Sequence, residues 1–77
     1  MQTTDIIVDA RGHHCPVPTL RLRRALEFAS PGDVISLYAD DPMAAIDVPH
    51  FVDQIGAQLL NQSSDGKTLT FRVRKPA

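Results

Sequence analysis

The sequence predicts an α+β fold, a βαβαββ two-layer sandwich in which two helices pack on one face of a four-stranded mixed sheet. Short β-branched or alternating apolar runs occupy 5–9, 33–39, 57–62 and 67–74, and helical apolar spacing appears between the first three of them. Helices that alternate with strands in so short a chain favour two packed layers. Because the 77 residues contain no repeat, linker or low-complexity segment, we expect a single domain over 1–77.

The first half of the chain is predicted as strand, helix and strand. Residues 5–9 form a β-branched run typical of a buried strand. A helix is expected from Pro16 to Ala29, ended by the Ser30-Pro31-Gly32 turn. Its apolar arc holds Pro18, Leu22, Ala25, Leu26 and Ala29, and its opposite side holds Leu20, Arg23, Arg24 and Glu27.

The second half is expected to contain a short helix and a hairpin. Because proline damages a helix interior, we predict a turn over 42–46, Asp47 as the helix N-cap and Pro49 in the first turn. The apolar stripe that follows is Val48, Phe51, Val52 and Ile55, and Gly56 ends the helix. Two strands then flank a turn at 63–66, with Leu69, Phe71 and Val73 facing inward.

Composition places the chain among ordinary globular proteins. It is 43% hydrophobic and 22% charged, with a formal net charge of −1, which argues against a dedicated nucleic-acid binder. No signal peptide or membrane span is evident, and a single cysteine fits a reducing compartment, so we expect a cytoplasmic protein. Residues 31–56 contain five aspartates and no lysine or arginine, while arginines gather around the first predicted helix.

The only cysteine, Cys15, stands directly before Pro16 and hence at or next to the N-cap of the first predicted helix. Unpaired N–H groups and the helix dipole favour a thiolate there, so we expect a lowered thiol pKa. Pro16 and Pro18 lack an N–H, which leaves Val17 as the natural donor to the sulfur, and Gly12 gives the preceding loop its freedom. The alternative is a small buried apolar cysteine.

His13 and His14 invite a metal interpretation, with His50 or an aspartate completing a zinc site with Cys15. Three consecutive loop residues seldom converge on one ion, so we expect neither a metal nor another cofactor. Instead the two imidazoles either lie beside the sulfur, where a protonated ring favours the thiolate, or are solvated without a role.

Leu20 falls on the polar side of the first predicted helix, one turn beyond Cys15. It is either an ordinary exposed leucine or the apolar centre of a docking patch whose rim is Arg21, Arg23 and Arg24. Asp40 and Asp41 lead into a turn, and roles in turn formation and capping account for them.

These residues resemble the TusA (SirA-like) family of small sulfur carriers. The likeness rests on Asp9-Ala10-Arg11-Gly12 followed by Cys15-Pro16-Val17-Pro18, similar to that family's Cys-Pro-x-Pro signature, and on Asp40-Asp41-Pro42, Asp47-Val48-Pro49-x-Phe51 and Gly56. The resemblance implies a βαβαββ sandwich. It also implies that Cys15 accepts sulfane sulfur as a persulfide from a cysteine desulfurase or rhodanese-like donor and passes it to an acceptor protein. His13 departs from the pattern, because the family usually has an apolar residue there.

Three functions therefore compete. The leading one is a sulfur carrier of the sulfurtransferase type, most simply a monomer, whose thiol meets two partners in turn. The second is a non-catalytic RNA- or protein-binding regulatory module that uses the arginine face of the first helix. The third is a redox sensor in which Cys15 is oxidised or capped by glutathione.

Overall fold

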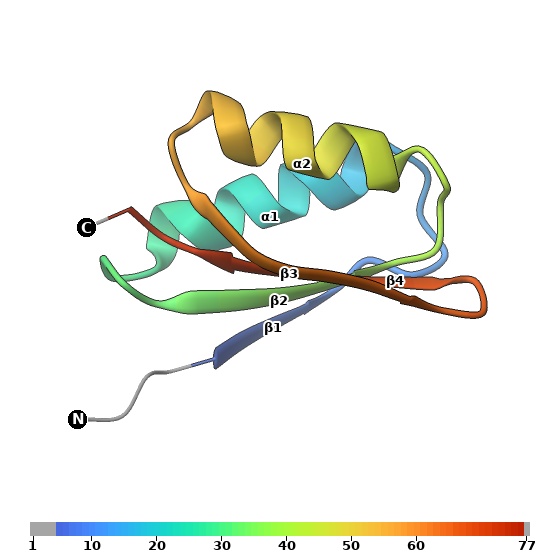
Figure 1. Ribbon diagram of the computed structural model, residues 1–77, viewed down its shortest axis with the longest axis horizontal. Helices are drawn as coiled ribbons and strands as arrows, with labels where there is room; N and C mark the ends of the chain where they lie inside the picture. Colours follow the sequence, from blue (N-terminus) through green and yellow to red (C-terminus); the bar gives the residue numbers. More distant parts are fainter. Residues whose placement is uncertain (1–4, 77) are drawn as a thin grey trace.

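The computed structural model describes residues 5–76 and has the predicted βαβαββ order. The strands are β1 (Asp5–Asp9), β2 (Val34–Ala39), β3 (Gln58–Asp65) and β4 (Thr68–Arg74); the helices are α1 (Val17–Phe28) and α2 (Ala44–Gln54). The sheet order is β1-β2-β4-β3, with β1 and β2 parallel and the other two pairs antiparallel. Both helices lie on the same side of this sheet, so the predicted mixed two-layer sandwich is confirmed (Figure 1).

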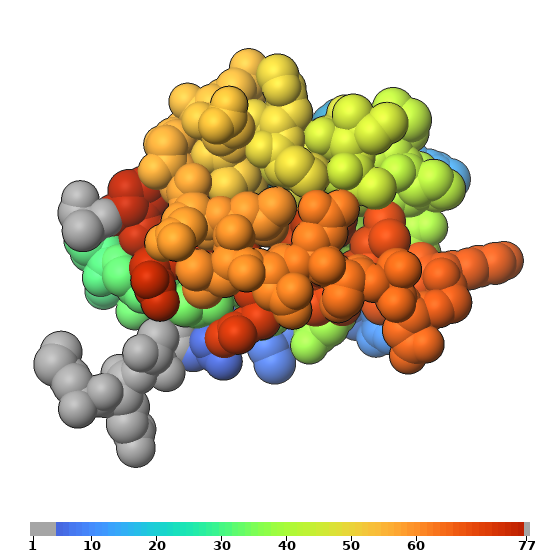
Figure 2. Space-filling view, in the orientation of Figure 1, coloured from blue at the N-terminus to red at the C-terminus, as the bar shows by residue number. Residues whose placement is uncertain are grey.

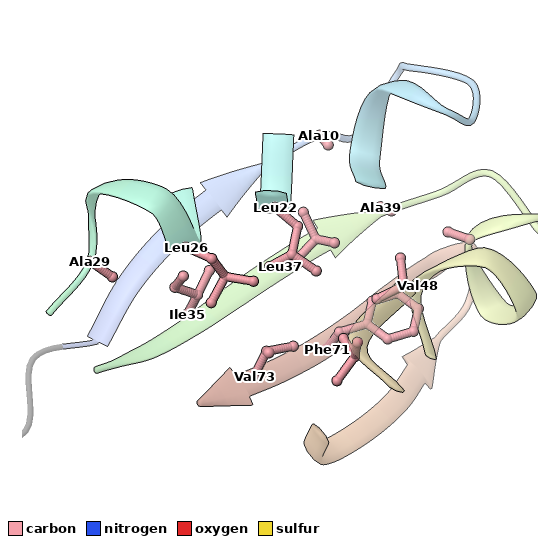
Figure 3. Close-up of a cluster of buried hydrophobic side chains, with 12 residues drawn as sticks. Ala10, Leu22, Leu26, Ala29, Ile35, Leu37, Ala39, Val48, Phe71 and Val73 are labelled. Atoms are coloured by element: carbon pink, nitrogen blue, oxygen red, sulfur yellow. The ribbon is translucent and has the colours of Figure 1, made fainter. Parts of the chain in front are cut away.

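The core lies between the helices and the two central strands. From α1, Leu22 and Leu26 point toward the sheet, where they meet residues of β2 and β4 (Figure 3). The largest fully buried side chains of this cluster are Phe71, Leu22, Ile35, Leu37, Val48 and Val73. The arcs predicted for α1 are confirmed, because Pro18, Leu22 and Leu26 are buried while the arginines opposite are exposed.

The first strand was predicted to be buried, but it is largely exposed. β1 pairs only with β2 and forms an edge of the sheet, where Ile7 is 67% exposed and Ile6 and Val8 are half-buried. A β-branched run predicts a strand but not its place in the sheet, because that place depends on which strands pair.

On the face of the sheet opposite the helices, an ion pair crosses the central strand β2. Arg72 of β4 pairs with Asp5 of β1 at 3.3 Å between Nη2 and Oδ1. In the sheet register these residues flank Ser36 and Val34, which are only 8% and 2% exposed. The long arginine stem covers the strand while its charged end stays at the surface.

Helix α2 begins earlier than predicted, at Ala44, and Pro49 lies inside it. Of the turn expected over 42–46, residues 42–43 form a tight turn, in which the carbonyls of Asp41 and Pro42 accept hydrogen bonds from Ala44 and Ala45. Residues 44–46 already belong to the helix, so its N-cap is Met43 and not Asp47. Pro49 therefore deprives the helix of one backbone hydrogen bond.

The C-terminal end of α2 is partly as predicted. The N–H of Ala57 bonds to the Val52 carbonyl across Gly56, whose φ of 73° is left-handed, and this closes the helix as expected. Ile55, expected in the buried stripe, lies just beyond the helix and is 42% exposed.

The hairpin is tighter than predicted. Ser63 and Ser64 pair with Thr70 and Leu69, so the connection shrinks to Gly66 and Lys67. Gly66 has a φ of 61°, which suits the first central position of a two-residue turn whose twist matches the strands. Phe71 and Val73 are buried and Leu69 is half-buried, so the predicted inward face of β4 is confirmed.

Candidate functional site: the Cys15 loop

Cys15 lies in the loop that joins β1 to α1, beside the segment that joins β2 to α2. Because β1 and β2 are parallel, both connections leave the sheet at the C-terminal ends of these two strands (Figure 1). In the space-filling view, blue atoms of the first loop emerge behind the yellow-green atoms of the second segment (Figure 2). The thiol is half-buried at this junction.

Two consecutive carboxylates tie these connections together. Both carboxylate oxygens of Asp40 accept the N–H of Gly12 at 3.0 Å. Asp41 accepts the N–H of Cys15 at 2.8 Å through Oδ2 and that of Met43 at 3.0 Å through Oδ1. These bonds lower the pKa of the Asp41 carboxyl. Assigning both aspartates to local turns was therefore too narrow, since each also fixes the backbone of the cysteine loop.

The opposite end of the loop is clamped by Asp9 and Arg11. The guanidinium of Arg11 donates from Nε and Nη2 to the two carboxylate oxygens of Asp9, at 2.9 and 2.8 Å. This two-pronged pair, with the Arg11 N–H as a further donor, lowers the pKa of Asp9 to about 2. Gly12 follows with a φ of 84°, which confirms the freedom predicted for it.

The environment of the thiol contradicts the expected lowering of its pKa. Burial raises the pKa of Cys15, and the negative charges of Asp47 and Asp41 raise it further. Of the side chains that act on this pKa, only the Thr19 hydroxyl lowers it. Neither Asp47 nor Thr19 was predicted to act on the thiol.

The helix N-terminus fails to offset these charges for a local reason. Helix α1 begins at Val17 with Pro16 at its N-cap, so Cys15 lies one residue before the cap. Pro16 and Pro18 lack an N–H, and the Val17 N–H donates to the His14 carbonyl at 2.9 Å. The predicted donor to the sulfur is therefore occupied elsewhere.

The histidines do not surround the sulfur. The His14 side chain is 97% exposed, and its Nδ1 lies 3.7 Å from Oδ2 of Asp41, so it faces that carboxylate. His13 and His50 are also exposed. Within residues 5–76, no three histidine, cysteine or acidic side chains are grouped as a metal site requires.

The predicted patch on α1 does come together. Leu20 is 54% exposed, and it shares a shallow groove with Val17, Arg21, Arg23, Arg24 and Glu27. Two of the arginines also have intramolecular contacts: Arg21 donates to the Asp9 carbonyl at 3.3 Å, and the guanidinium of Arg24 lies 5.5 Å from the centre of the Phe28 ring. No helix among the described residues is long and apolar enough to cross a membrane.

The chain is a small βαβαββ sandwich that presents one half-buried thiol just before the start of α1. Its fold matches the crystal structure of a SirA-like protein from Desulfitobacterium hafniense, with a TM-score of 0.81 and 23% identity over 94% of this chain and 99% of that one.

Sequence comparison identifies the family. A profile described as Sulfurtransferase TusA matches residues 6–75. Proteins named sulfur carrier protein TusA are similar along nearly their whole length. The one from Pseudomonas putida strain F1 is 35% identical over 97% of this chain and 94% of its own. The one from Pseudomonas aeruginosa strain PAO1 is 32% identical over 97% and 95%. The chain belongs to the TusA family.

Proposed function

We propose that this chain is a sulfur carrier that accepts sulfane sulfur as a persulfide on Cys15 and passes it to a partner protein. The observation that carries this proposal is the half-buried Cys15 thiol, anchored through its own N–H by Asp41 at the edge of the sheet. Membership in the TusA family, whose Pseudomonas relatives are named sulfur carriers, supports it.

The transfer exchanges one sulfur–sulfur bond for another. The Cys15 thiolate attacks the terminal sulfur of a donor persulfide, a bond forms between Sγ and that sulfur, and the donor leaves as a thiolate that takes up the proton lost by Cys15. An acceptor thiolate later attacks the same sulfur and Cys15 becomes the leaving group. The sulfane sulfur keeps its oxidation state throughout, so no further oxidant or reductant is needed. The chain holds no second cysteine to discharge the persulfide as an internal disulfide.

The proposed supporting residues fix where the sulfur stands. Gly12 supplies the left-handed turn of the loop, Pro16 and Pro18 stiffen the start of α1, and Val17 closes the loop through its bond to His14. In this proposal residues 1–77 act as one carrier domain in a reducing compartment, where the thiol stays free.

The donor we propose is a cysteine desulfurase or a rhodanese-like protein, docked on the α1 groove. Leu20 would supply the apolar contact, with Arg21, Arg23 and Arg24 around it, on the helix that follows Cys15. A small apolar centre with a charged rim is the usual anatomy of such an interface, and arginine is enriched there.

Intact mass spectrometry tests the proposal directly. After incubation with cysteine and a cysteine desulfurase, we expect the wild-type protein to gain one sulfur atom that a reductant removes. Cys15→Ser replaces the thiol with a hydroxyl of similar size and should gain none. Absence of any gain in the wild type, both with this donor and with thiosulfate and a rhodanese, would refute the carrier function.

A further inference from the structure

Two large apolar side chains stand exposed at the start of α2. Met43, the N-cap residue, is 50% exposed, and Ile46, three residues later, is 65% exposed. Residues at this spacing are neighbours on a helix surface. Ala44, Val48 and Val52 bury the opposite side of α2, so the pair faces away from the core. A single exposed apolar side chain needs no explanation, whereas neighbours with a polar rim mark an interaction surface.

The apolar pair adjoins the Cys15 loop. The Asp41 carboxylate accepts the N–H of Cys15 at 2.8 Å through Oδ2 and the N–H of Met43 at 3.0 Å through Oδ1. Because one carboxylate holds both N–H groups, the backbones of Cys15 and Met43 are fixed next to each other. Both helices begin at this end of the molecule (Figure 1). A standard interface covers about 800 Å² on each partner, so one centred on Met43 and Ile46 includes the cysteine loop.

Acidic side chains flank the apolar pair. Asp47 lies four residues after Met43, His50 lies four residues after Ile46, and Asp53 follows on the same side of the helix. Asp47 is half-buried, whereas His50 and Asp53 are exposed. None of the ion pairs within residues 5–76 involves either aspartate, so both charges can act on a partner. Lysine or arginine side chains would complement this rim.

The groove on α1 has the opposite charge, because Arg21, Arg23 and Arg24 line it beside Leu20. A partner matched to these arginines presents carboxylates, which the aspartates of α2 would repel. Each helix therefore offers an apolar centre with a rim of its own sign, and both helices start at the cysteine loop. Attraction to one rim combined with repulsion by the other is a means of telling two partners apart.

We infer that Met43 and Ile46 are the centre of a second docking surface, with Asp47, His50 and Asp53 as its rim, which fits an acceptor protein that presents lysine or arginine around an apolar recess. The inference rests on the proposed carrier function, in which two partners must reach one thiol, and deepens it by giving the acceptor a surface chemistry. The donor docks on the α1 groove and the acceptor on the α2 surface, so their charges differ in sign.

Two matched peptides test this surface with the folded full chain. Each contains one cysteine, two leucines and three charged residues, which are lysines in one peptide and glutamates in the other. The peptide cysteine carries thionitrobenzoate in a disulfide. The Cys15 thiolate attacks the peptide sulfur, a disulfide forms between protein and peptide, and thionitrobenzoate leaves as a coloured thiolate. We define the charge ratio as the rate with the lysine peptide divided by the rate with the glutamate peptide.

The charge ratio isolates docking, because a change in the reactivity of the thiol itself affects both peptides alike. At an ionic strength of about 0.01 M, Ile46→Ser should lower the ratio about five-fold, a usual effect of truncating a central interface residue. Met43→Ser, which introduces a favoured N-cap residue, should act in the same direction. Asp47→Asn and Asp53→Asn should each lower the ratio about two- to three-fold, and about 1 M salt should abolish their effects.

Ile55→Ser is the matched control, because Ile55 is 42% exposed just beyond the other end of α2. Its charge ratio should equal that of the wild type. Leu20→Ser removes the centre of the α1 groove and should raise the ratio, because it slows only the glutamate peptide. The inference is overturned if Ile46→Ser keeps the wild-type ratio, or if Ile55→Ser lowers the ratio as much.

Two further measurements separate the alternatives. If sedimentation of the wild type shows a dimer that Ile46→Ser abolishes, the surface binds a second copy of the chain and the acceptor assignment is wrong. Sulfur loading, followed by mass, distinguishes this inference from the carrier function. Loading of the wild type without the expected change in charge ratio refutes only the second docking surface, and that change without any loading refutes only the carrier.

Discussion

Leu22 is the side chain on which the position of α1, and hence of the site, depends most directly. It is fully buried and packs in the same cluster as Leu37 of β2 and Phe71 of β4 (Figure 3). Leu22→Ala removes three carbon atoms, a loss of about 2.4 kcal/mol at about 0.8 kcal/mol for each buried methylene. The residual cavity brings the expected loss in the free energy of unfolding to about 3–4 kcal/mol.

Urea unfolding followed by circular dichroism measures this loss. A domain of 77 residues has a total free energy of unfolding of about 4–12 kcal/mol, so the variant stays folded only if the wild type lies above the low end. With an m-value of about 1–1.5 kcal/mol/M, the midpoint should fall by about 2–4 M. Leu20→Ala, on the same helix but 54% exposed, is the control and should change the free energy by less than about 0.5 kcal/mol. A loss below about 1 kcal/mol for Leu22→Ala would show that burial of this side chain does not hold α1 on the sheet.

Three further predictions concern the cysteine loop. Asp41→Asn leaves one amide oxygen to serve two N–H groups, so amide exchange at Cys15 or Met43, followed by NMR, should become faster; unchanged protection at both would contradict the bonding described. Gly12→Ala places a side chain at a φ of 84° with no atom within 4 Å to clash with it. Backbone strain alone should then cost about 1 kcal/mol and lower the melting temperature by about 4–8 °C, and an unchanged temperature would exclude it. Because the folded pKa of Asp9 is lowered from 3.8 to about 2, its ion pair stabilises the fold above about pH 4, and this contribution is lost as the pH falls through 2. Arg11→Gln should return the Asp9 pKa, measured by NMR titration, toward its ordinary value; a pKa that stays near 2 would assign the shift to another group.

Apolar spacing and turn residues were sufficient to define the helices and strands, and most of the fold was predicted from them. Helix α1 has an apolar arc of about three turns and a clear stop, and the structure places both its ends within one residue of the prediction. The start of α2 was placed too late because Pro49 was assumed to exclude a preceding turn, whereas packing of Ala44 and Val48 in the core outweighs the lost hydrogen bond. The edge position of β1 has no local signature at all.

Sequence alone pointed to Cys15 but gave the wrong direction for its pKa. The expected lowering depended on the dipole of α1 and on one free N–H, that of Val17, but the Val17 N–H donates to the carbonyl of His14. The prediction also left out Asp47, whose charge raises the pKa of the thiol and which belongs to α2, packed beside α1 above the sheet (Figure 1). Burial raises the pKa of the thiol most, and a charge from another helix adds to it through a medium of low dielectric, so the two together outweigh a dipole whose donors are missing.

Asp40 and Asp41 accept hydrogen bonds from the N–H groups of Gly12 and Cys15. These bonds cannot be predicted when each turn is considered by itself. Both residues follow β2 directly, and the loop they bind follows β1. Only when the two strands are paired in parallel do their C-terminal ends meet, and the pairing itself depends on the connection through α1. Once that topology is set, a carboxylate at the end of β2 lies beside unpaired N–H groups of the neighbouring loop, which need an acceptor. The same sheet that packs the core therefore holds the Cys15 loop in position, although its anchors lie far from the cysteine in the sequence.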